Sequence, residues 1–232
     1  MDPTPQSPTG ARACILDRAA CAIGIAPEGG VIVAAVVIIA VVLLTTGFFP
    51  LGVVAAIAAV AIGMFFRDPE RFPSASDRAV LSAADGVVCA IDEAPMPDGD
   101  PAPCRRVSVF MSPLNVHVNR APVAGEIVST KHTAGAFSAA FRDIASEHNE
   151  RNMIILKDSA GRLCGVMQIA GYLARRIVCR VAPGDAVARG QRVGLIMFGS
   201  RVDHFFSPEY AVTVKIGDKV RAGESIIGEL QL

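Results

Sequence analysis

The sequence lacks several features that would assign it to a common functional class. Its 22 basic and 22 acidic side chains cancel, so it has no excess of positive charge with which to hold nucleic acid. Its six cysteines form no C-x-x-C pair and no spacing typical of a metal site. Scattered thiols of this kind indicate a reducing compartment. We therefore expect no metal centre, and a soluble part that faces the cytoplasm.

One long stretch lacks charge altogether. The 36 residues from Val31 to Phe66 are rich in Ala, Val, Ile and Leu. Gly and Pro interrupt them at 45–52, which predicts two helical segments, Val31–Leu44 and Val53–Phe66, each about 14 residues or ~21 Å long. Each is short for a complete membrane span, which needs about 20 residues. A helical hairpin that dips into a membrane is the favoured interpretation. A kinked single span and two buried helices of a soluble core are the alternatives, and the missing polar stripe argues against the second.

The rest of the chain has the pattern of a β protein. Residues 1–30 are expected to form a flexible N-terminal segment, 31–66 the membrane-associated helical segment, and 67–232 a β-rich domain. Short β-branched runs separated by Gly, Pro and Asp predict a sandwich or barrel. The segment Ala139–Glu147 is expected to be helical or irregular. The expected strands are Gly86–Ile91, Arg106–Met111, Gly125–Thr130, Met153–Lys157, Cys164–Ile169, Arg176–Val181, Val193–Phe198, Tyr210–Ile216 and Ser225–Leu230.

An internal repeat refines this prediction. The pattern G-D-x-V-x-x-G occurs at Gly184–Gly190 and again, 33 residues later, at Gly217–Gly223. It resembles the paired turns of biotinyl/lipoyl-type β-sandwiches, so the fold class we expect is mainly β, with a lipoyl/biotinyl-like β-sandwich core. Carrier domains of that type modify a lysine on the hairpin between the two halves. No lysine lies between Pro183 and Lys215, which disfavours a carrier and leaves Gly199-Ser200 at the hairpin tip.

A Gly-Ser pair can carry unusual chemistry. The hydroxyl of Ser200 can attack the carbonyl of Gly199, which is accessible because glycine has no Cβ. The resulting ester can eliminate to dehydroalanine, and hydrolysis then leaves a pyruvoyl group at a new N-terminus. Most Gly-Ser pairs are ordinary turns, so the significance of this one depends on the rest of the sequence.

Five motifs in order give the pair its context, and together they resemble the short-form phosphatidylserine decarboxylases, which are self-processing and pyruvoyl-dependent. The motifs are Phe65–Arg71, Ser82–Gly86, Met111–Pro122, Asn149–Arg151 and Phe198–Asp203. The resemblance implies cleavage between Gly199 and Ser200 into a β chain (1–199) and an α chain (200–232) that begins with pyruvate. It also implies that the substrate amine forms a Schiff base with the pyruvoyl group, loses CO₂ and leaves as phosphatidylethanolamine.

The same resemblance assigns roles to other residues. His117 lies in the matching motif and is expected to act as a general acid or base, with Asp85 orienting it. Ala83 stands where the usual S-P-A-D-G motif has Pro. Arg120 occupies the position of a second histidine in long-form members, so either His117 serves both steps, or His132 or His204 substitutes. Arg120 could instead bind the carboxylate or phosphate of the substrate, or be an ordinary surface arginine.

Partners and location follow from this interpretation. The substrate is expected to be a phospholipid in the cell membrane, and the protein a heterodimer of the two chains, with its catalytic domain on the cytoplasmic face. A membrane-anchored, non-enzymatic adaptor with a lipoyl-like domain is the alternative, although the coiled-coil heptads usual for it are absent. An ordinary serine hydrolase is disfavoured because no G-x-S-x-G surrounds Ser200. An archaeal ether-linked substrate would share the same headgroup chemistry.

Overall fold

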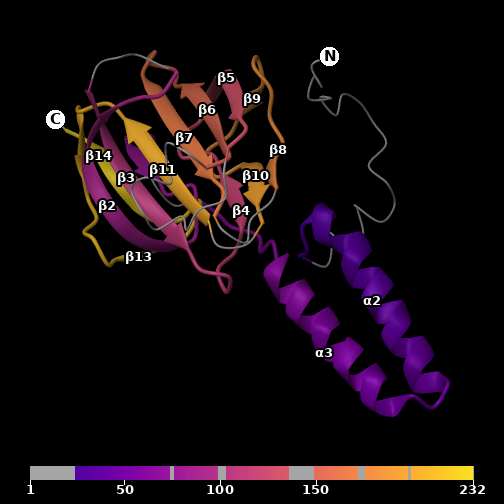
Figure 1. Cartoon of the computed structure of the whole chain (residues 1–232). Helices are drawn as coiled ribbons and strands as arrows, with labels where there is room; N and C mark the ends of the chain where they lie inside the picture. The colour runs from indigo at the N-terminus through magenta and orange to yellow at the C-terminus, as the bar shows by residue number, and fades with distance from the viewer. Residues whose placement is uncertain are drawn as a thin grey trace. The chain divides into compact units, whose positions relative to one another are not determined.

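The computed structural model describes residues 24–73, 76–98, 103–135, 149–171, 176–197 and 200–231 (Figure 1). The chain divides into two compact units, the first ending at Glu70 and the second beginning at Arg71. The expected helical or irregular segment Ala139–Glu147 lies outside the described residues, and so does Gly199.

The first unit is a pair of apolar helices, α2 (Pro27–Thr45) and α3 (Phe49–Phe65), that run side by side as the hairpin interpretation predicts (Figure 1). Ala40 and Ala59 are buried in this unit. A Cβ added at Gly29 would meet the ring of Phe66, and one added at Gly52 would meet the side chain of Leu44. Small residues thus let the two helices pack closely.

Both ends of the hairpin are joined at its base. The Ala26 N–H donates to the carbonyl of Phe66 at 2.7 Å, and the Asp68 N–H donates to that of Gly24 at 2.6 Å. The chain therefore enters and leaves the hairpin at the same place. A kinked single helix would separate these ends.

The helices are longer than the sequence pattern indicated. They contain 19 and 17 residues, so α2 is about 28 Å long. Each begins about four residues early because proline is tolerated in the first turn of a helix. By length and apolar composition, α2 could cross a membrane. Large apolar side chains such as Ile38 (63% exposed) and Ile57 (65%) face outward on both helices, which is unfavourable in water.

The second unit is built from antiparallel strands. The described residues form an eight-stranded sheet in the order β13-β2-β3-β11-β7-β6-β5-β9 and two three-stranded sheets, β1-β14-β12 and β4-β10-β8. The large sheet curls around the main apolar core (Figure 1). The strands are β1 (Ala79–Leu81), β2 (Gly86–Pro95), β3 (Pro103–Met111), β4 (Val118–Arg120), β5 (Gly125–Thr133), β6 (Arg151–Lys157), β7 (Leu163–Ile169), β8 (Ile177–Cys179), β9 (Ala186–Val187), β10 (Arg192–Ile196), β11 (Ser200–Phe206), β12 (Tyr210–Val212), β13 (Lys219–Val220) and β14 (Ile226–Leu230).

Every strand expected from the sequence is present, but the pattern missed β1, β4, β9, β11 and β13. The omission of β11 matters most. All seven residues from Ser200 to Phe206 are buried, and the strand lies between β3 and β7 near the middle of the large sheet. The expectation that Ser200 occupies an exposed hairpin tip is therefore wrong. The prediction failed because the strand carries Arg201, Asp203 and His204, which interrupt an apolar run.

The two G-D-x-V-x-x-G turns make equivalent hydrogen bonds. In each turn the backbone of the first glycine and of the aspartate forms hydrogen bonds with one strand of the large sheet. The N–H of the last glycine donates to the segment that precedes this strand. The pairs are Gly184 and Asp185 with Ile127, Gly217 and Asp218 with Val88, Gly190 with Ala121, and Gly223 with Ser82. The unit thus contains a structural repeat. Its likeness to the lipoyl/biotinyl sandwich stays a prediction.

Candidate active site

Ser200 begins β11 and is fully buried. It pairs with Met111 of β3, and its Oγ lies 3.5 Å from the Sδ of that residue. A thioether is a weak hydrogen-bond acceptor. Among the described residues, the Ser200 hydroxyl thus has a weak partner in a site closed to water, and it can approach a carbonyl without first breaking a strong bond.

Asp85 lies in an ion pair with Arg71. The two guanidinium nitrogens Nη1 and Nη2 are 2.6 and 2.9 Å from its carboxylate oxygens, and both side chains are nearly buried. The backbone N–H of Ala222 also donates to Asp85 at 2.8 Å, while its carbonyl accepts from Arg71. These contacts occupy the carboxylate, and the expected pairing with a histidine is not among them.

His204 is fully buried, and its tautomer follows from its neighbours. The Ala83 N–H donates to Nε2 at 2.8 Å, so Nδ1 carries the proton and donates to the carbonyl of Val107 at 2.9 Å. Burial lowers the pKa of His204 to about 4, although the bond to Val107 and the charge of Asp203 oppose this shift. The imidazole is neutral near pH 7 and both nitrogens are bonded, so His204 is a poor substitute for a second catalytic histidine.

His132 lies far along the sheet from the reactive serine. It is half exposed on β5, and its Nε2 is 3.0 Å from Glu150. When the directly paired residues are followed from His132 across β6 and β7, they end at Val202 of β11. Three strand spacings along the sheet are about 14 Å, so His132 does not reach Ser200 in this arrangement.

His117 is fully buried, immediately before β4. Its carbonyl accepts the N–H of Ile196 at 3.3 Å, which continues the pairing of β4 with β10. Asn119, two residues later in this extended segment, approaches Met111 Sδ at 3.8 Å. The segment that carries His117 thus borders the sulfur that contacts Ser200.

Arg120 is also buried, and it lies against the last glycine of the second repeat turn. Its Nη1 donates to the carbonyl of Gly190 at 3.0 Å. A Cβ at Gly223 would lie 3.0 Å from its Cδ and 3.5 Å from the Cα of Gly190. Arg120 therefore packs between the two repeat turns and is not an ordinary surface residue. Its role as a substrate ligand stays a prediction.

The structure also assembles a polar network that sequence reasoning missed. Gln168 Nε2 donates to Asn119 Oδ1 at 2.8 Å, and Asn152 Nδ2 donates to Gln168 Oε1 at 2.9 Å. All three residues are buried. They come from β4, β7 and β6, so no local motif contains them, although Asn152 and Gln168 stand out as polar residues inside apolar strands.

The opposite face of β11 carries a second missed feature. Arg201 and Asp203 form an ion pair, with Nε 2.8 Å and Nη2 2.9 Å from the two carboxylate oxygens. Both side chains are almost completely buried, beside the smaller apolar cluster that includes Met167 and Phe205. The pair stiffens the first residues of the strand that begins with Ser200.

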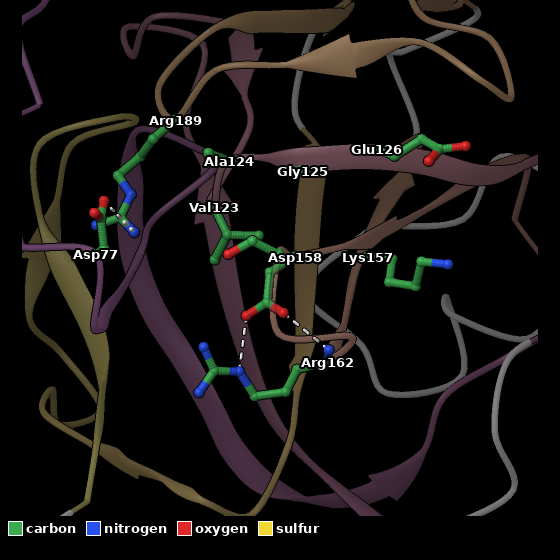
Figure 2. A pocket seen from close by; sticks show the side chains of 10 residues that line it. Asp77, Val123, Ala124, Gly125, Glu126, Lys157, Asp158, Arg162 and Arg189 are labelled. Carbon is green, nitrogen blue, oxygen red and sulfur yellow. Dashed lines mark hydrogen bonds and ion pairs between the residues drawn. The ribbon is translucent and has the colours of Figure 1, made fainter.

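A cavity of about 400 Å³ lies elsewhere in this unit (Figure 2). In Figure 2 the carboxylate of Asp158 points toward Arg162, at 2.7 Å from its Nε. Ser200, His117 and Asp85 do not line the cavity. Asp158 follows β6 at the edge where β11 ends with Phe206, so the cavity lies at the end of the sheet remote from Ser200.

Comparisons with known proteins agree on one family. A family model described as phosphatidylserine decarboxylase matches residues 59–228. The phosphatidylserine decarboxylase proenzyme of Thermobifida fusca is 51% identical over 171 residues, which cover 73% of this chain and 74% of that protein. The proenzyme of Desulfotalea psychrophila is 44% identical over 166 residues (72% and 78%), and that of Magnetococcus marinus 44% over 183 residues (78% and 84%).

Proposed function

The chain belongs to the phosphatidylserine decarboxylase family, and we propose that it makes its own catalytic group by cleaving itself between Gly199 and Ser200. The name proenzyme, given to its relatives, supports this processing. The observation that carries the proposal is the buried hydroxyl of Ser200, whose partner among the described residues is a thioether. Phosphatidylethanolamine and CO₂ are the products of the decarboxylation.

Processing requires no outside reactant except water. The Ser200 Oγ loses its proton to a base and bonds to the Gly199 carbonyl carbon, and the Ser200 nitrogen leaves with a proton, which gives an ester. Loss of the Cα proton then breaks the Cβ–Oγ bond, releasing the Gly199 carboxylate and leaving dehydroalanine. Water replaces the nitrogen, which leaves as ammonia, and a pyruvoyl group remains on residue 200.

The surroundings of Ser200 suit such a group. Residue 200 lies at the start of a strand flanked by β3 and β7, in a buried position with an apolar neighbour. The pyruvoyl group supplies a ketone that binds the substrate amine and accepts the electron pair released with CO₂. The pairing of β11 with β3 and β7 keeps residue 200 in a fixed position.

The arrangement of the strands also supports a stable two-chain product. Residues 200–232 contribute β11 to the large sheet between β3 and β7, β13 to its edge beside β2, and β14 to the sheet with β1. Cleavage before Ser200 breaks none of these pairings. The α chain therefore stays bound to the β chain as a heterodimer.

His117 is the proposed general acid or base for both steps. It is buried in the segment next to Met111, whereas His204 is committed to structural hydrogen bonds and His132 lies on a distant strand. Orientation of His117 by Asp85 remains part of the proposal, and the Arg71–Asp85 pair gives Asp85 a second role in joining the chains.

The apolar hairpin supports a place at the cell membrane. A diacyl phospholipid stays in the bilayer, so an enzyme that acts on it gains from an anchor of this kind. The cytoplasmic face for the second unit is supported by the scattered cysteines, since Cys89, Cys104, Cys164 and Cys179 form no disulfide among the described residues.

Reductive trapping tests the proposal. Purified protein is incubated with phosphatidylserine and sodium cyanoborohydride, and the mass of each chain is measured. We expect the 33-residue α chain to gain the mass of the reduced lipid adduct, and the β chain to gain none. Ser200→Ala should show no adduct. Decarboxylation of phosphatidylserine without labelling of the α chain would contradict the proposal, and a membrane adaptor would show neither labelling nor decarboxylation.

A further inference from the structure

A line of three buried amide side chains crosses the interior of the second unit toward Ser200. Asn152 of β6, Gln168 of β7 and Asn119 of β4 are each at most 3% exposed. Burying three amide side chains is unfavourable unless their polar atoms are satisfied. Such a network has a reason to persist where it holds one group in a defined orientation.

The direction of donation along the line is uniform. Asn152 Nδ2 donates to Gln168 Oε1, and Gln168 Nε2 donates to Asn119 Oδ1. Since Oδ1 of Asn119 accepts, its Nδ2 must point the other way. The network thus fixes which end of the Asn119 amide faces the reactive serine.

That end has only weak acceptors among the described residues. Asn119 Nδ2 lies 3.4 Å from the carbonyl of Ala83, which already accepts the Arg120 N–H at 2.9 Å, and 3.8 Å from Met111 Sδ. The same sulfur is the partner of the Ser200 hydroxyl at 3.5 Å. Two buried donors, one fixed by the amides and one on the reactive residue, therefore meet at one thioether.

We propose that Asn119, held by Gln168 and Asn152, is a positioning residue that sets the rate at which Ser200 attacks in self-cleavage. This inference rests on the proposed function. The N–H groups of the Asn119 side chain hold Met111. They also place partial positive charge near the Ser200 hydroxyl, which becomes negative as its proton leaves. All three amides belong to residues 1–199, so the line is complete before cleavage and survives it.

Gln168→Glu tests the direction of hydrogen-bond donation along the three amides. A protonated glutamic acid still donates to Asn119 and accepts from Asn152, whereas an ionised one cannot donate and favours a flipped Asn119 amide. We expect processing close to the wild-type rate at low pH and slower by at least about tenfold at high pH, where the carboxylate forms. The measured quantity is the ratio of variant to wild-type rate of α-chain release at each pH. Asn119→Leu should be slow throughout, with no such pH dependence of the ratio.

Hydroxylamine locates the affected step, because it cleaves an ester between Gly199 and Ser200 without elimination. If the line acts on the attack of Ser200, hydroxylamine should not restore fast cleavage in ionised Gln168→Glu. Restoration to the wild-type rate would place the defect after ester formation and overturn the proposal.

Controls separate this effect from loss of stability. Ile154→Val in the main core removes a buried methylene and is expected to lower the temperature of thermal unfolding without slowing processing. Thermal unfolding of each variant in a Ser200→Ala background reports whether it folds. If wild-type protein is cleaved and both amide variants keep its rate, the inference fails alone. If wild-type protein is never cleaved, the proposed function fails.

Discussion

Arg71 and Asp85 face each other in a two-point ion pair, and the backbone of Ala222 bonds to both of them. Cleavage before Ser200 would leave Arg71 and Asp85 on the β chain and Ala222 on the α chain. This nearly buried ion pair thus connects three parts of the chain. They are the segment that follows the apolar hairpin, the segment Ser82–Gly86 and the second repeat turn.

Removing either partner should weaken this junction. Asp85→Asn leaves the Arg71 guanidinium without its counter-charge, and we expect a loss of about 3 kcal/mol in urea unfolding of the uncleavable Ser200→Ala protein. The double variant with Arg71→Met should lose less than the sum of the two single changes.

The same two variants separate the proposed roles of Asp85. If its ion pair with Arg71 is what processing needs, Arg71→Met should slow α-chain release as much as Asp85→Asn does. Normal processing in Arg71→Met together with none in Asp85→Asn would instead show that Asp85 acts on a catalytic group by itself.

The lowered pKa of His204 predicts how the free energy of unfolding depends on pH. Its folded-state pKa is lowered to about 4 by burial, below the unfolded value of about 6.5. The unfolded chain therefore binds a proton first, and stability is lost as the pH falls from about 6.5 to about 4, by about 3 kcal/mol in all. Urea unfolding of Ser200→Ala protein between pH 4 and pH 8 measures this loss. His204→Gln should flatten the curve over this range, and an unchanged slope would remove His204 as its cause.

Gly223 allows a test of the position of Arg120. Gly223→Ala places a Cβ at a residue with φ of +74° and 3.0 Å from Arg120 Cδ. Gly161→Ala is the matched control, because its φ is +83° but a Cβ there has open space. We expect both to lose about 1 kcal/mol from the backbone conformation, and Gly223→Ala to lose more because Arg120 must move. Equal losses in the free energy of unfolding, measured in urea, would show that Arg120 moves away from the new Cβ without cost.

Charges on the hairpin test its contact with lipid. Ile38→Lys and Ile57→Lys put lysines on exposed apolar faces of α2 and α3, and each should disfavour insertion by about 3 kcal/mol if it enters the bilayer centre. Flotation with phospholipid vesicles should show both variants released at a salt concentration that retains the wild type. Val128→Lys, on an exposed apolar residue of β5, is the control and should stay bound.

Local patterns in the sequence were sufficient to predict the hairpin, most strands and the paired turns. The uncharged run of 36 residues, interrupted by Gly and Pro near its middle, favoured a hairpin of two helices, and the G-D-x-V-x-x-G pattern indicated the two turns. Strand β11 was missed because Arg201 and Asp203 read as a polar loop. Their mutual pairing, which makes burial tolerable, is visible only in three dimensions.

The candidate site was predictable only in part, for a similar reason. Ser200 and His117 come from contiguous motifs, whereas the partner of Asp85 lies 14 residues before it and a further partner 137 residues after it. The amides of Asn119, Gln168 and Asn152 meet across three strands. No single-sequence pattern specifies such a meeting, because strand order decides it.

The mass of the native protein tests the central claim most directly. We predict two chains, residues 1–199 and a 33-residue chain whose N-terminus resists Edman degradation and carries the mass of pyruvate in place of Ser200. Ser200→Ala should remain a single chain. A wild-type protein that decarboxylates phosphatidylserine while its full-length chain stays intact would contradict the account.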